Sequence, residues 1–290
     1  MISKEKITIT CADGVELKGL LLIPEKPKAV VQFNAGTGAK KEFYQSFLEY
    51  IASHGYICCL WDYRGSGESA PVSLSGCNYT FSDYGLKDMP AVKSYLNRRF
   101  PHLPFTVVAH SAGGQQWGFH QDSNNIKGML GFGVSTGYAP YQPVGFRVLS
   151  NYFFHVVTPI SILLTGYVAA KKVSSMENLP KNVVREWRDW CKKPDYFFNP
   201  KFYGKTVPIG NFKNYTFPIH VVAATDDPIS NSRTIPAYWN NVNSTAGITH
   251  QTISPKQYEL KKIEHFGFFK KNMKDTLWAE AVQKLDSFIA

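Results

Sequence analysis

The sequence lacks long charged runs and an apolar N-terminal segment, and its composition is that of a globular protein. Charged residues make up only 19% of the chain, and no run of five or more Lys or Arg occurs although the net charge is +10. Basic residues occur as separated doublets, which favours a solvated surface over a nucleic-acid site. The N-terminal residues lack an apolar segment after their charges, which favours a cytoplasmic location over export. An anionic substrate or a loose membrane association stays open.

Cysteine is scarce, and the spacing of the cysteines argues against a disulfide-stabilised fold and against a zinc site. The five cysteines are odd in number and form no C-x-x-C pair, so they indicate neither a disulfide framework nor a zinc site. Cys58 and Cys59 are adjacent in an apolar run that resembles a strand, where neighbouring side chains point to opposite faces. We therefore expect buried free thiols in a reducing compartment. No H-E-x-x-H sequence occurs, and we expect neither a metal nor a cofactor.

One long apolar segment raises the question of a membrane span. Residues 152–170 carry no Lys, Arg, Asp or Glu, and the segment is close to the length that crosses a bilayer. It also contains His155, Pro159 and Gly166, and the chain on both sides has the pattern of a soluble α/β protein. We interpret it as a buried or substrate-facing helical cap and expect no stable membrane insertion.

Short apolar runs alternate with helical patterns along much of the chain. Strands that alternate with helices predict an α/β fold with a mainly parallel sheet covered by helices on both faces. From residue 135 to residue 215 the alternation stops, and aromatic residues, Pro and Gly become frequent. We therefore expect a core of residues 1–134 and 216–290, with residues 135–215 inserted as a cap over the strand ends.

The predicted strands are 7–10, 17–23, 29–34, 56–61, 105–109, 128–134, 218–225 and 251–254. The predicted helices are 43–54, 82–99 with Ser82 as N-cap, 231–239 and 271–289.

Ser111 lies in the most informative stretch of the sequence, F-T-V-V-A-H-S-A-G-G from Phe105 to Gly114. A β-branched apolar run followed by a serine between small residues is typical of a nucleophile elbow, a sharp turn between strand and helix. Ala109 and Gly113, two residues before and after the serine, provide the small side chains that such a turn needs. The alternative is that Ser111 only caps the helix that follows.

A serine nucleophile needs a histidine base and an acid that orients it, in the chain order Ser, Asp or Glu, His. The apolar run V-V-A-A-T is followed by Asp226 and Asp227, where a triad acid would stand, although Asp-Pro also initiates turns. His265 lies in the segment E-H-F-G-F-F before the last predicted helix. His250 is a rival base, but it lies inside an apparent strand, which makes a packed structural role the better interpretation.

The remaining requirement is a pair of N–H donors for the oxyanion that forms during acyl transfer. The N–H of Ala112, directly after the nucleophile, is one candidate. The loop Ala35-Gly36-Thr37-Gly38, after an early predicted strand, is the expected source of the other. A simple glycine-rich turn is the alternative, and phosphate binding is poorly supported because no Walker lysine and serine follow.

Together these motifs resemble the α/β-hydrolase superfamily over nearly the whole chain. The segment D-Y-R-G-S-G-E-S from Asp62 to Ser69 adds a turn found in many of these enzymes, and W-R-D-W-C at residues 187–191 is similar to a group of bacterial predicted hydrolases near the serine aminopeptidase and monoacylglycerol lipase branch. The resemblance implies Asp227 rather than Asp226 as the acid and Thr37 as the second oxyanion donor. It also implies that His110 is buried beneath the elbow. Ala109 for Gly, Asn34-Ala35 for His-Gly, and Glu264 before the histidine depart from the family pattern.

The resemblance implies a serine hydrolase with the triad Ser111, Asp227 and His265 that cleaves a carboxylic ester or thioester of a small acyl substrate. Aminopeptidase or acyltransferase activity is the alternative, and Glu177, Glu186 and Asp189 of the cap are acids that could hold a peptide's free amine. A non-catalytic ligand-binding protein is an alternative of another class. The oligomeric state has no sequence signal. Apolar cap residues would form a roof over the site or simply pack in the core, namely Phe154, Ile160, Leu163, Leu164, Trp187 and Trp190.

Overall fold

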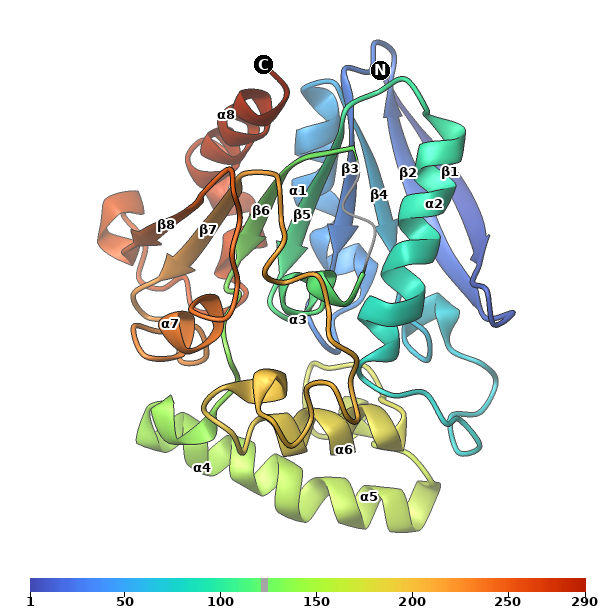
Figure 1. Ribbon diagram of the computed structural model, residues 1–290, viewed down its shortest axis with the longest axis vertical. Coiled ribbons are helices and arrows are strands. Elements are labelled where there is room, and N and C mark those ends of the chain that lie inside the picture. Colours follow the sequence, from blue (N-terminus) through green and yellow to red (C-terminus); the bar gives the residue numbers. More distant parts are fainter. Residues whose placement is uncertain (121–124) are drawn as a thin grey trace.

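A single twisted sheet organises the computed structural model, which describes residues 1–120 and 125–290. The sheet has eight strands in the order β1-β2-β4-β3-β5-β6-β7-β8 (Figure 1). The strands are β1 Ile2–Thr10, β2 Glu16–Pro24, β3 Ala29–Asn34, β4 Tyr56–Trp61, β5 Phe105–His110, β6 Ile126–Phe132, β7 Ile219–Ala224 and β8 Ile248–Ile253. All the predicted strands are present, with shifts of a few residues at their ends.

The pairing of the strands agrees with the expectation of a mainly parallel sheet. β1 pairs antiparallel with β2, and β2 pairs antiparallel with β4, whereas every pairing from β3 to β8 is parallel. β3, β4 and β5 are buried at every position, because a central parallel sheet has helices on both faces. The carboxyl ends of the parallel strands lie along one edge of the sheet (Figure 1).

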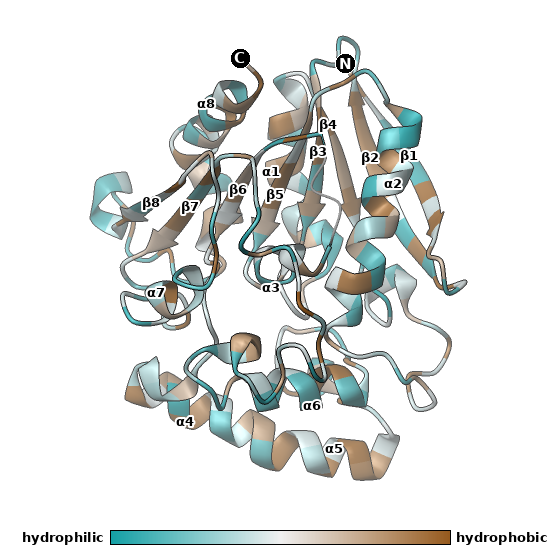
Figure 2. Ribbon diagram, viewed as in Figure 1, coloured by the Kyte–Doolittle hydropathy of each residue, from teal (hydrophilic) through white to brown (hydrophobic). Residues whose placement is uncertain are grey.

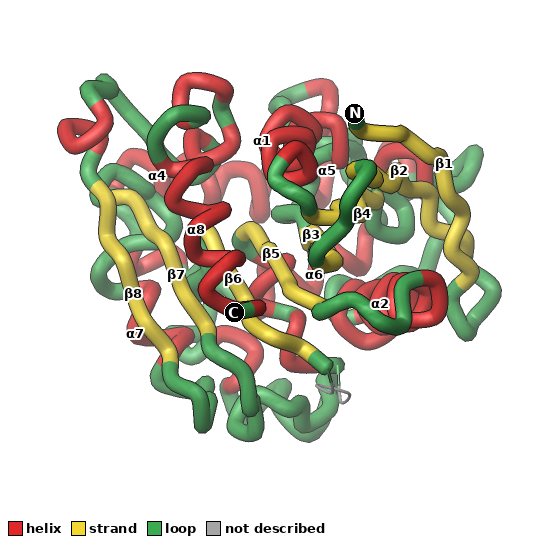
Figure 3. The backbone as a smooth tube through the Cα atoms, turned by 90° about the horizontal axis from the view of Figure 1, so that it is seen from above, coloured by secondary structure: helices red, strands yellow, loops and turns green. Residues whose placement is uncertain are grey.

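Helices cover both faces of this sheet. α1 (Lys41–Ser53) and α8 (Leu277–Ile289) lie together on one face, and α2 (Met89–Arg99) lies on the other (Figure 3). The short helices α3 (Ala112–Gln115) and α7 (Thr234–Trp239) follow β5 and β7. Aromatic rings such as those of Phe47 and Trp278, 5.5 Å apart, fill the space between α1 and α8. The chain termini lie at the end of the molecule opposite to the cap (Figure 1).

Two helices contain a π-helical turn just ahead of a proline. Residues Tyr84–Asp88 form one before Pro90, and residues Phe153–Val157 form the other before Pro159. Proline lacks an N–H and its ring clashes with the carbonyl four residues earlier, so widening the preceding turn accommodates it within a continuous helix.

The prediction that Ser82 caps the helix over residues 82–99 is wrong. Its hydroxyl and its N–H both donate to the carboxylate of Glu186 in the cap, at 3.1 and 2.8 Å. Ser82 therefore links the core to the cap. No side-chain capping bond was found at the start of this helix among the described residues.

The segment between β6 and β7 adds no strand to the described part of the sheet. It contains α4 (Val144–Tyr152), α5 (Thr158–Thr165) and α6 (Lys181–Trp190), which lie beyond the carboxyl edge of the strands (Figure 1). With the π-helical turn between them, α4 and α5 form one continuous helix. This helix, Val144–Thr165, has 22 residues and a mean hydropathy of 1.4, so its length and composition would suffice to cross a membrane.

The expectation that residues 152–170 form a buried or substrate-facing helix is wrong in one respect. The segment is helical up to Thr165, but only 11% of the most apolar 18-residue window of the helix Val144–Thr165 is buried. Ile160, Leu163 and Leu164 are exposed instead of forming a roof over the site, with Leu163 83% exposed. The apolar composition of α4 and α5, seen as brown segments in Figure 2, predicted a covered surface, yet many of these apolar side chains are exposed.

The prediction of buried free thiols is confirmed for four of the five cysteines. All five cysteines are free thiols, and Cys58 and Cys59 are fully buried in β4. Burial raises the pKa of the Cys11 thiol to about 12. Only Cys77 is partly exposed.

Candidate active site

Ser111 sits at the sharp turn between β5 and α3. Its backbone has φ 50° and ψ −118°, a conformation that L residues rarely adopt and that is found where a structure holds a residue under strain. Its side chain makes no capping hydrogen bond to α3. The capping alternative is therefore not how the structure uses this hydroxyl.

Gly113 explains why the residue two after the serine is small. A Cβ at this position would lie 2.2 Å from the carbonyl oxygen of Asn34 and 2.8 Å from that of Ala35. α3 can then approach the end of β3 only with a glycine here. This close approach brings the first residues of α3 beside the loop that follows β3.

The carboxyl ends of β7 and β8 bring an acid and a histidine together. The Nδ1 atom of His265 lies 2.7 Å from Oδ2 of Asp227, and both side chains are buried. The other carboxylate oxygen, Oδ1, accepts hydrogen bonds from the N–H groups of Ile229 and Ser230 at 2.8 and 2.9 Å. Because the carboxylate accepts, Nδ1 carries the proton and Nε2 keeps its lone pair.

Asp226, the neighbouring acid, has a different task. Its two carboxylate oxygens accept hydrogen bonds from the N–H groups of Ile263 and Glu264, at 2.9 and 3.1 Å. Glu264 has a φ of 56° in the left-handed region, so the loop needs this anchor to hold its shape. Asp226 thus positions the loop that carries His265, whereas Asp227 contacts the imidazole itself.

His250, the rival base, lies within β8. Its ring packs against Trp239 with ring centroids 5.7 Å apart, and burial lowers the pKa of its imidazole. Its described contacts do not include Ser111 or either aspartate. His250 is nevertheless exposed on β8, the edge strand of the sheet, so the expectation of a packed structural role is wrong, and its described contacts do not make it a base for Ser111.

His110 lies beneath the elbow, where it joins two parts of the site. Its Nε2 lies 2.8 Å from the backbone oxygen of His265, and a carbonyl oxygen can only accept, so Nε2 carries the proton. Its Nδ1 must then accept from the hydroxyl of Tyr44, 2.8 Å away, and that hydroxyl accepts in turn from the N–H of Gly36 at 3.0 Å. Burial keeps the pKa of His110 well below its usual range, so the ring stays neutral.

This chain of hydrogen bonds connects the loop after β3 to the backbone of the loop that carries His265. Gly36 has no room for a side chain, because a Cβ there would lie 2.6 Å from Nδ1 of His110. Sequence reasoning did not identify Tyr44. It lies on α1 at a position that is spaced like any other buried residue of that helix, so its hydroxyl had no distinguishing signal.

The N–H groups of Ala112 and Thr37 are the two predicted oxyanion donors. Ala112 begins α3 directly after Ser111, and Thr37 lies in the loop after β3 that Gly113 approaches. Neither N–H donates a hydrogen bond to another group in the described part of the chain. Both donors are thus available to an oxygen atom bound above the elbow.

The cap contacts the loop that carries Thr37. The N–H of Glu177 donates to the carbonyl oxygen of Gly38 at 2.8 Å. A Cβ at Gly38 would lie 2.9 Å from the end of the Met176 side chain, so Met176 packs directly on the loop. The cap therefore forms part of the wall around the site.

The three aromatic residues predicted to contact substrate have different surroundings. Trp190 is fully buried among Phe81, Tyr196 and Phe197, with ring centroids 5.2 to 5.3 Å away, which is core packing. Trp187 keeps partial exposure and packs against Phe154 at 5.0 Å. Phe154 is buried as well, so Trp187 is the one of the three that keeps accessible surface for a substrate contact.

The three cap acids considered for binding an amine already have partners. Glu177 pairs with Lys40 and Lys171 at 3.4 and 2.8 Å. Asp189 pairs with Arg188 and Lys192 at 3.1 and 3.0 Å. Glu186 accepts from Ser82, and burial raises the pKa of its carboxyl to about 7.

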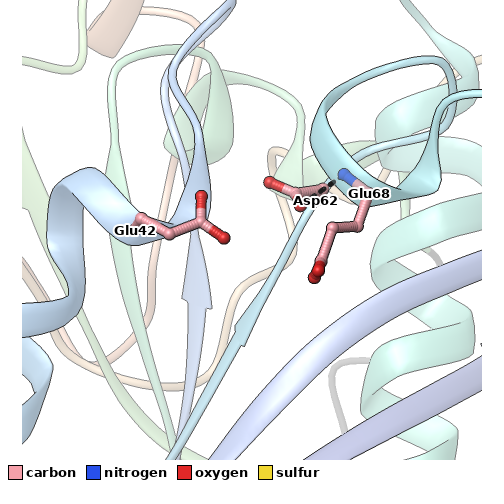
Figure 4. Close-up of side chains that lie close together, drawn as sticks. All are labelled: Glu42, Asp62 and Glu68. Carbon is pink, nitrogen blue, oxygen red and sulfur yellow. Dashed lines mark hydrogen bonds between the residues drawn. The ribbon is translucent and has the colours of Figure 1, made fainter.

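The turn D-Y-R-G-S-G-E-S holds the start of α1 in place. Asp62 accepts hydrogen bonds from the N–H groups of Lys41 and Glu68, at 3.0 and 3.1 Å. The carboxylates of Glu42, Asp62 and Glu68 lie close together (Figure 4). The ammonium of Lys41 lies among them, 2.8, 2.7 and 2.5 Å from their respective oxygens, so a cation of the protein itself occupies the centre of this cluster and offsets part of its charge.

Arg64, in the same turn, is buried between two acids. Its Nε lies 2.6 Å from Asp88, and a terminal nitrogen lies 2.7 Å from Asp13. A hydrogen bond from Arg64 lowers the pKa of the Asp13 carboxyl to about 2. The motif therefore ties β4 to α2 and to the β1–β2 turn, and its role here is structural.

Comparison with known proteins places this architecture in a family. No curated protein matches the sequence. Many solved structures are similar in fold, and the following three are among them. An esterase from Pyrococcus furiosus is 14% identical, with a TM-score of 0.62 over 100% of this chain and 92% of its own. A carboxyl esterase from Bacillus coagulans is 14% identical, with a TM-score of 0.58 over 100% of both chains. A soluble variant of monoglyceride lipase from Saccharomyces cerevisiae is 14% identical, with a TM-score of 0.64 over 99% of this chain and 94% of its own.

The sequence match is more specific than these structural likenesses. It covers residues 25–186, more than half of the chain, and includes the loop after β3, the elbow and much of the cap. The mainly parallel sheet with helices on both faces is the α/β-hydrolase fold, as the sequence predicted. The chain therefore belongs to the serine aminopeptidase S33 family of hydrolases.

Proposed function

We propose that this protein is a serine hydrolase that cleaves carboxylic esters through an acyl-enzyme on Ser111. The observation that carries the proposal is the 2.7 Å contact between Asp227 and His265, on the same edge of the sheet as the strained Ser111. An imidazole held in one tautomer by a buried carboxylate is the base that a serine nucleophile requires.

The reaction follows from these positions. The Ser111 hydroxyl attacks the ester carbonyl carbon while its proton passes to Nε2 of His265, and Asp227 stabilises the imidazolium. The N–H groups of Ala112 and Thr37 bind the oxygen that becomes negative. The imidazolium then gives its proton to the leaving alkoxide oxygen as the C–O bond breaks. A water molecule attacks the acyl-enzyme, loses a proton to His265 and releases the acid, and that proton returns to Ser111.

The cap supports an ester rather than a peptide with a free amino terminus. An aminopeptidase needs a carboxylate that can pair with the substrate's ammonium group. Glu177 and Asp189 are each paired with two cations of the protein, and Glu186 is bound to Ser82. Recruiting Glu177 or Asp189 would take a counter-ion away from two cations of the protein, and recruiting Glu186 would break its hydrogen bonds with Ser82.

The free thiols support a reducing compartment, and we propose that the protein acts in the cytoplasm. Four of the five cysteines are buried and none forms a disulfide. This agrees with cytoplasmic proteins, in which thiols stay reduced.

Labelling with a fluorophosphonate probe tests the nucleophile. We expect the wild-type protein to label, and we expect Ser111→Ala and His265→Ala to lose labelling while circular dichroism stays unchanged. Ser53→Ala, a substitution of an exposed serine on α1, is the matched control and should label like the wild type. Well-folded wild-type protein without Ser111-dependent labelling would refute the enzyme proposal and favour a ligand-binding protein.

A substrate panel then tests the bond that is cleaved. We expect hydrolysis of p-nitrophenyl esters of several acyl chain lengths and no hydrolysis of aminoacyl p-nitroanilides. Faster cleavage of the anilides would identify an aminopeptidase. Transfer of the acyl group to an added alcohol in preference to water would identify an acyltransferase.

A further inference from the structure

The outer face of the helix Val144–Thr165 is a continuous apolar surface. We name it the outer stripe and define it by its large exposed apolar residues. Eight of the fourteen large hydrophobic residues that are exposed in the described chain belong to it. They are Val144, Val148, Leu149, Tyr152, Val156, Ile160, Leu163 and Leu164. They recur at helical spacing, so they lie along one side of α4 and α5. An exposed apolar surface of this extent marks an interaction site.

The opposite face of this helix is apolar as well. Phe154 and Thr158 are buried against the rest of the cap, and Phe153 and Ile162 pack against the core. A helix that is apolar on both sides belongs in an interior or in contact with lipid. Because the inner face already packs on the protein, only the outer stripe needs a partner.

The charge of the cap points to the kind of partner. Residues 135–215 contain eleven Lys or Arg and four Asp or Glu, a net +7 out of the +10 of the whole chain. The helix itself contains no Asp or Glu. Arg147 lies on the helix, and Arg185 and Arg188 lie beside it on α6. An apolar helix without acids in a basic segment has the composition that binds an anionic lipid surface.

A cavity at the edge of the outer stripe has both apolar walls and basic side chains. It has a volume of about 310 Å³ and lies between α5 and α6. Ile162, Leu163 and Pro159 form apolar walls, and Arg185 and Arg188 of α6 supply two guanidinium groups. Arg188 already donates through Nε to Asp189 at 3.1 Å, so a phosphate would be bound by its terminal nitrogens. Arginine forks match the oxygens of a phosphate, while the aliphatic walls suit the start of an acyl chain.

We propose that the outer stripe lies flat on a bilayer of anionic phospholipids, with headgroup phosphates bound at Arg185 and Arg188. A flat orientation fits because the inner face is packed and the chain turns back at Gly166, which has a left-handed φ of 79°. Spanning the bilayer would require the helix to leave the cap. A second copy is a poorer partner, because pairing two such caps would bring two +7 segments together.

This placement does not depend on the chemistry at Ser111. It would hold α6, with Trp187 and the cap wall of the candidate site, close to the lipid headgroups, since α6 lies next to α5 across the cavity. An amphiphilic ester could then reach the cap without leaving the surface.

Vesicle flotation with the full chain tests the proposal. We expect binding to vesicles of phosphatidylcholine and phosphatidylglycerol mixed two to one, weaker binding in high salt, and little binding to phosphatidylcholine alone. The double variant Leu163→Ser with Leu164→Ser should bind about tenfold or more weakly, because two exposed leucines no longer enter the lipid. Arg185→Gln with Arg188→Gln should lose most of the preference for phosphatidylglycerol.

Val72→Ser is the matched control, since Val72 is a fully exposed apolar residue outside the outer stripe. It should bind like the wild type, and all variants should keep Ser111-dependent fluorophosphonate labelling, which reports an intact site separately from lipid binding. Absence of flotation by the wild type overturns the proposal. So does a wild-type dimer in analytical ultracentrifugation that becomes a monomer in the leucine variant, because the outer stripe would then be an interface between copies.

Discussion

At the scale of single residues, the site depends on fixed hydrogen-bond directions. Two adjacent aspartates after β7 illustrate this, because one contacts the imidazole of His265 and the other contacts only the backbone of its loop. An amide can replace a carboxylate in shape at either position. Loss of the charge at Asp227 affects the imidazole itself, whereas loss of the charge at Asp226 affects only the backbone of the loop.

Asp227→Asn should lower kcat/KM for a p-nitrophenyl ester by about 10²- to 10⁴-fold, because the amide favours the wrong tautomer of His265 and does not stabilise the imidazolium. Asp226→Asn is the matched control and should stay within about tenfold of the wild type, since it perturbs only the loop. Steady-state kinetics of the two purified variants measure the difference. Equal losses in both would contradict the assignment of Asp227 as the acid.

Tyr44→Phe should impair both stability and turnover. The buried Nδ1 of His110 and the buried N–H of Gly36 would each lose a partner, which costs about 1–3 kcal/mol in the free energy of unfolding. The loop with Thr37 would also be held less well, so kcat should fall more than KM rises. Tyr50→Phe, on the same helix, is the control and should leave both quantities unchanged in urea unfolding and ester hydrolysis.

The candidate triad could be found in sequence because its chemistry requires particular residue types in a fixed order. Asp226 and Asp227, by contrast, were separated only by family resemblance, and the structure gives the physical reason in the directions of their hydrogen bonds. Tyr44 could not be found, since its partner His110 is 66 residues away and no local pattern links the two.

At the scale of secondary-structure elements, burial decided which predictions succeeded. β3, β4 and β5 were predicted closely because a strand buried on both faces is a short, uninterrupted apolar run. The sequence of the helix Val144–Thr165 is also apolar, but the outer face of this helix is exposed instead of buried. Hydropathy indicates that a surface should be covered, but it does not say what covers it.

The contact between α6 and the start of the α2 region predicts a pH effect. Glu186 has a folded-state pKa of about 7, raised by burial above the usual value of a carboxyl. The folded state therefore holds this proton more tightly than the unfolded chain does. Its stabilising contribution is fully present below the unfolded pKa, near 4, and is lost as pH rises through about 7.

Urea unfolding at pH 5 and pH 8 checks this expectation. Glu186→Gln cannot ionise, so the variant should gain stability relative to the wild type by about 1–2 kcal/mol between the two pH values, after allowance for partial exposure of the side chain. Glu259→Gln, an exposed carboxyl, should show no such change. A constant difference between Glu186→Gln and the wild type across this range would rule out a raised pKa.

At the scale of the whole molecule, the distribution of thiols can be tested in one experiment. Cys77 is partly exposed, and the other four cysteines are buried. Native protein should therefore react with a thiol reagent at one site quickly, and unfolded protein should react at five. Cys77→Ser should abolish the fast reaction, and several fast-reacting thiols in the native protein would contradict the packed core described for β4.

The position of the termini has a practical consequence. Both chain ends lie at the end of the molecule away from α4 and α5 (Figure 1). A fluorescent protein or an affinity tag fused at either end would project into bulk water and leave the outer stripe unobstructed. A sensor chip that captures the chain by its terminus would therefore present the cap to the solution, whereas coupling through lysines, which are frequent in the cap, would hide it.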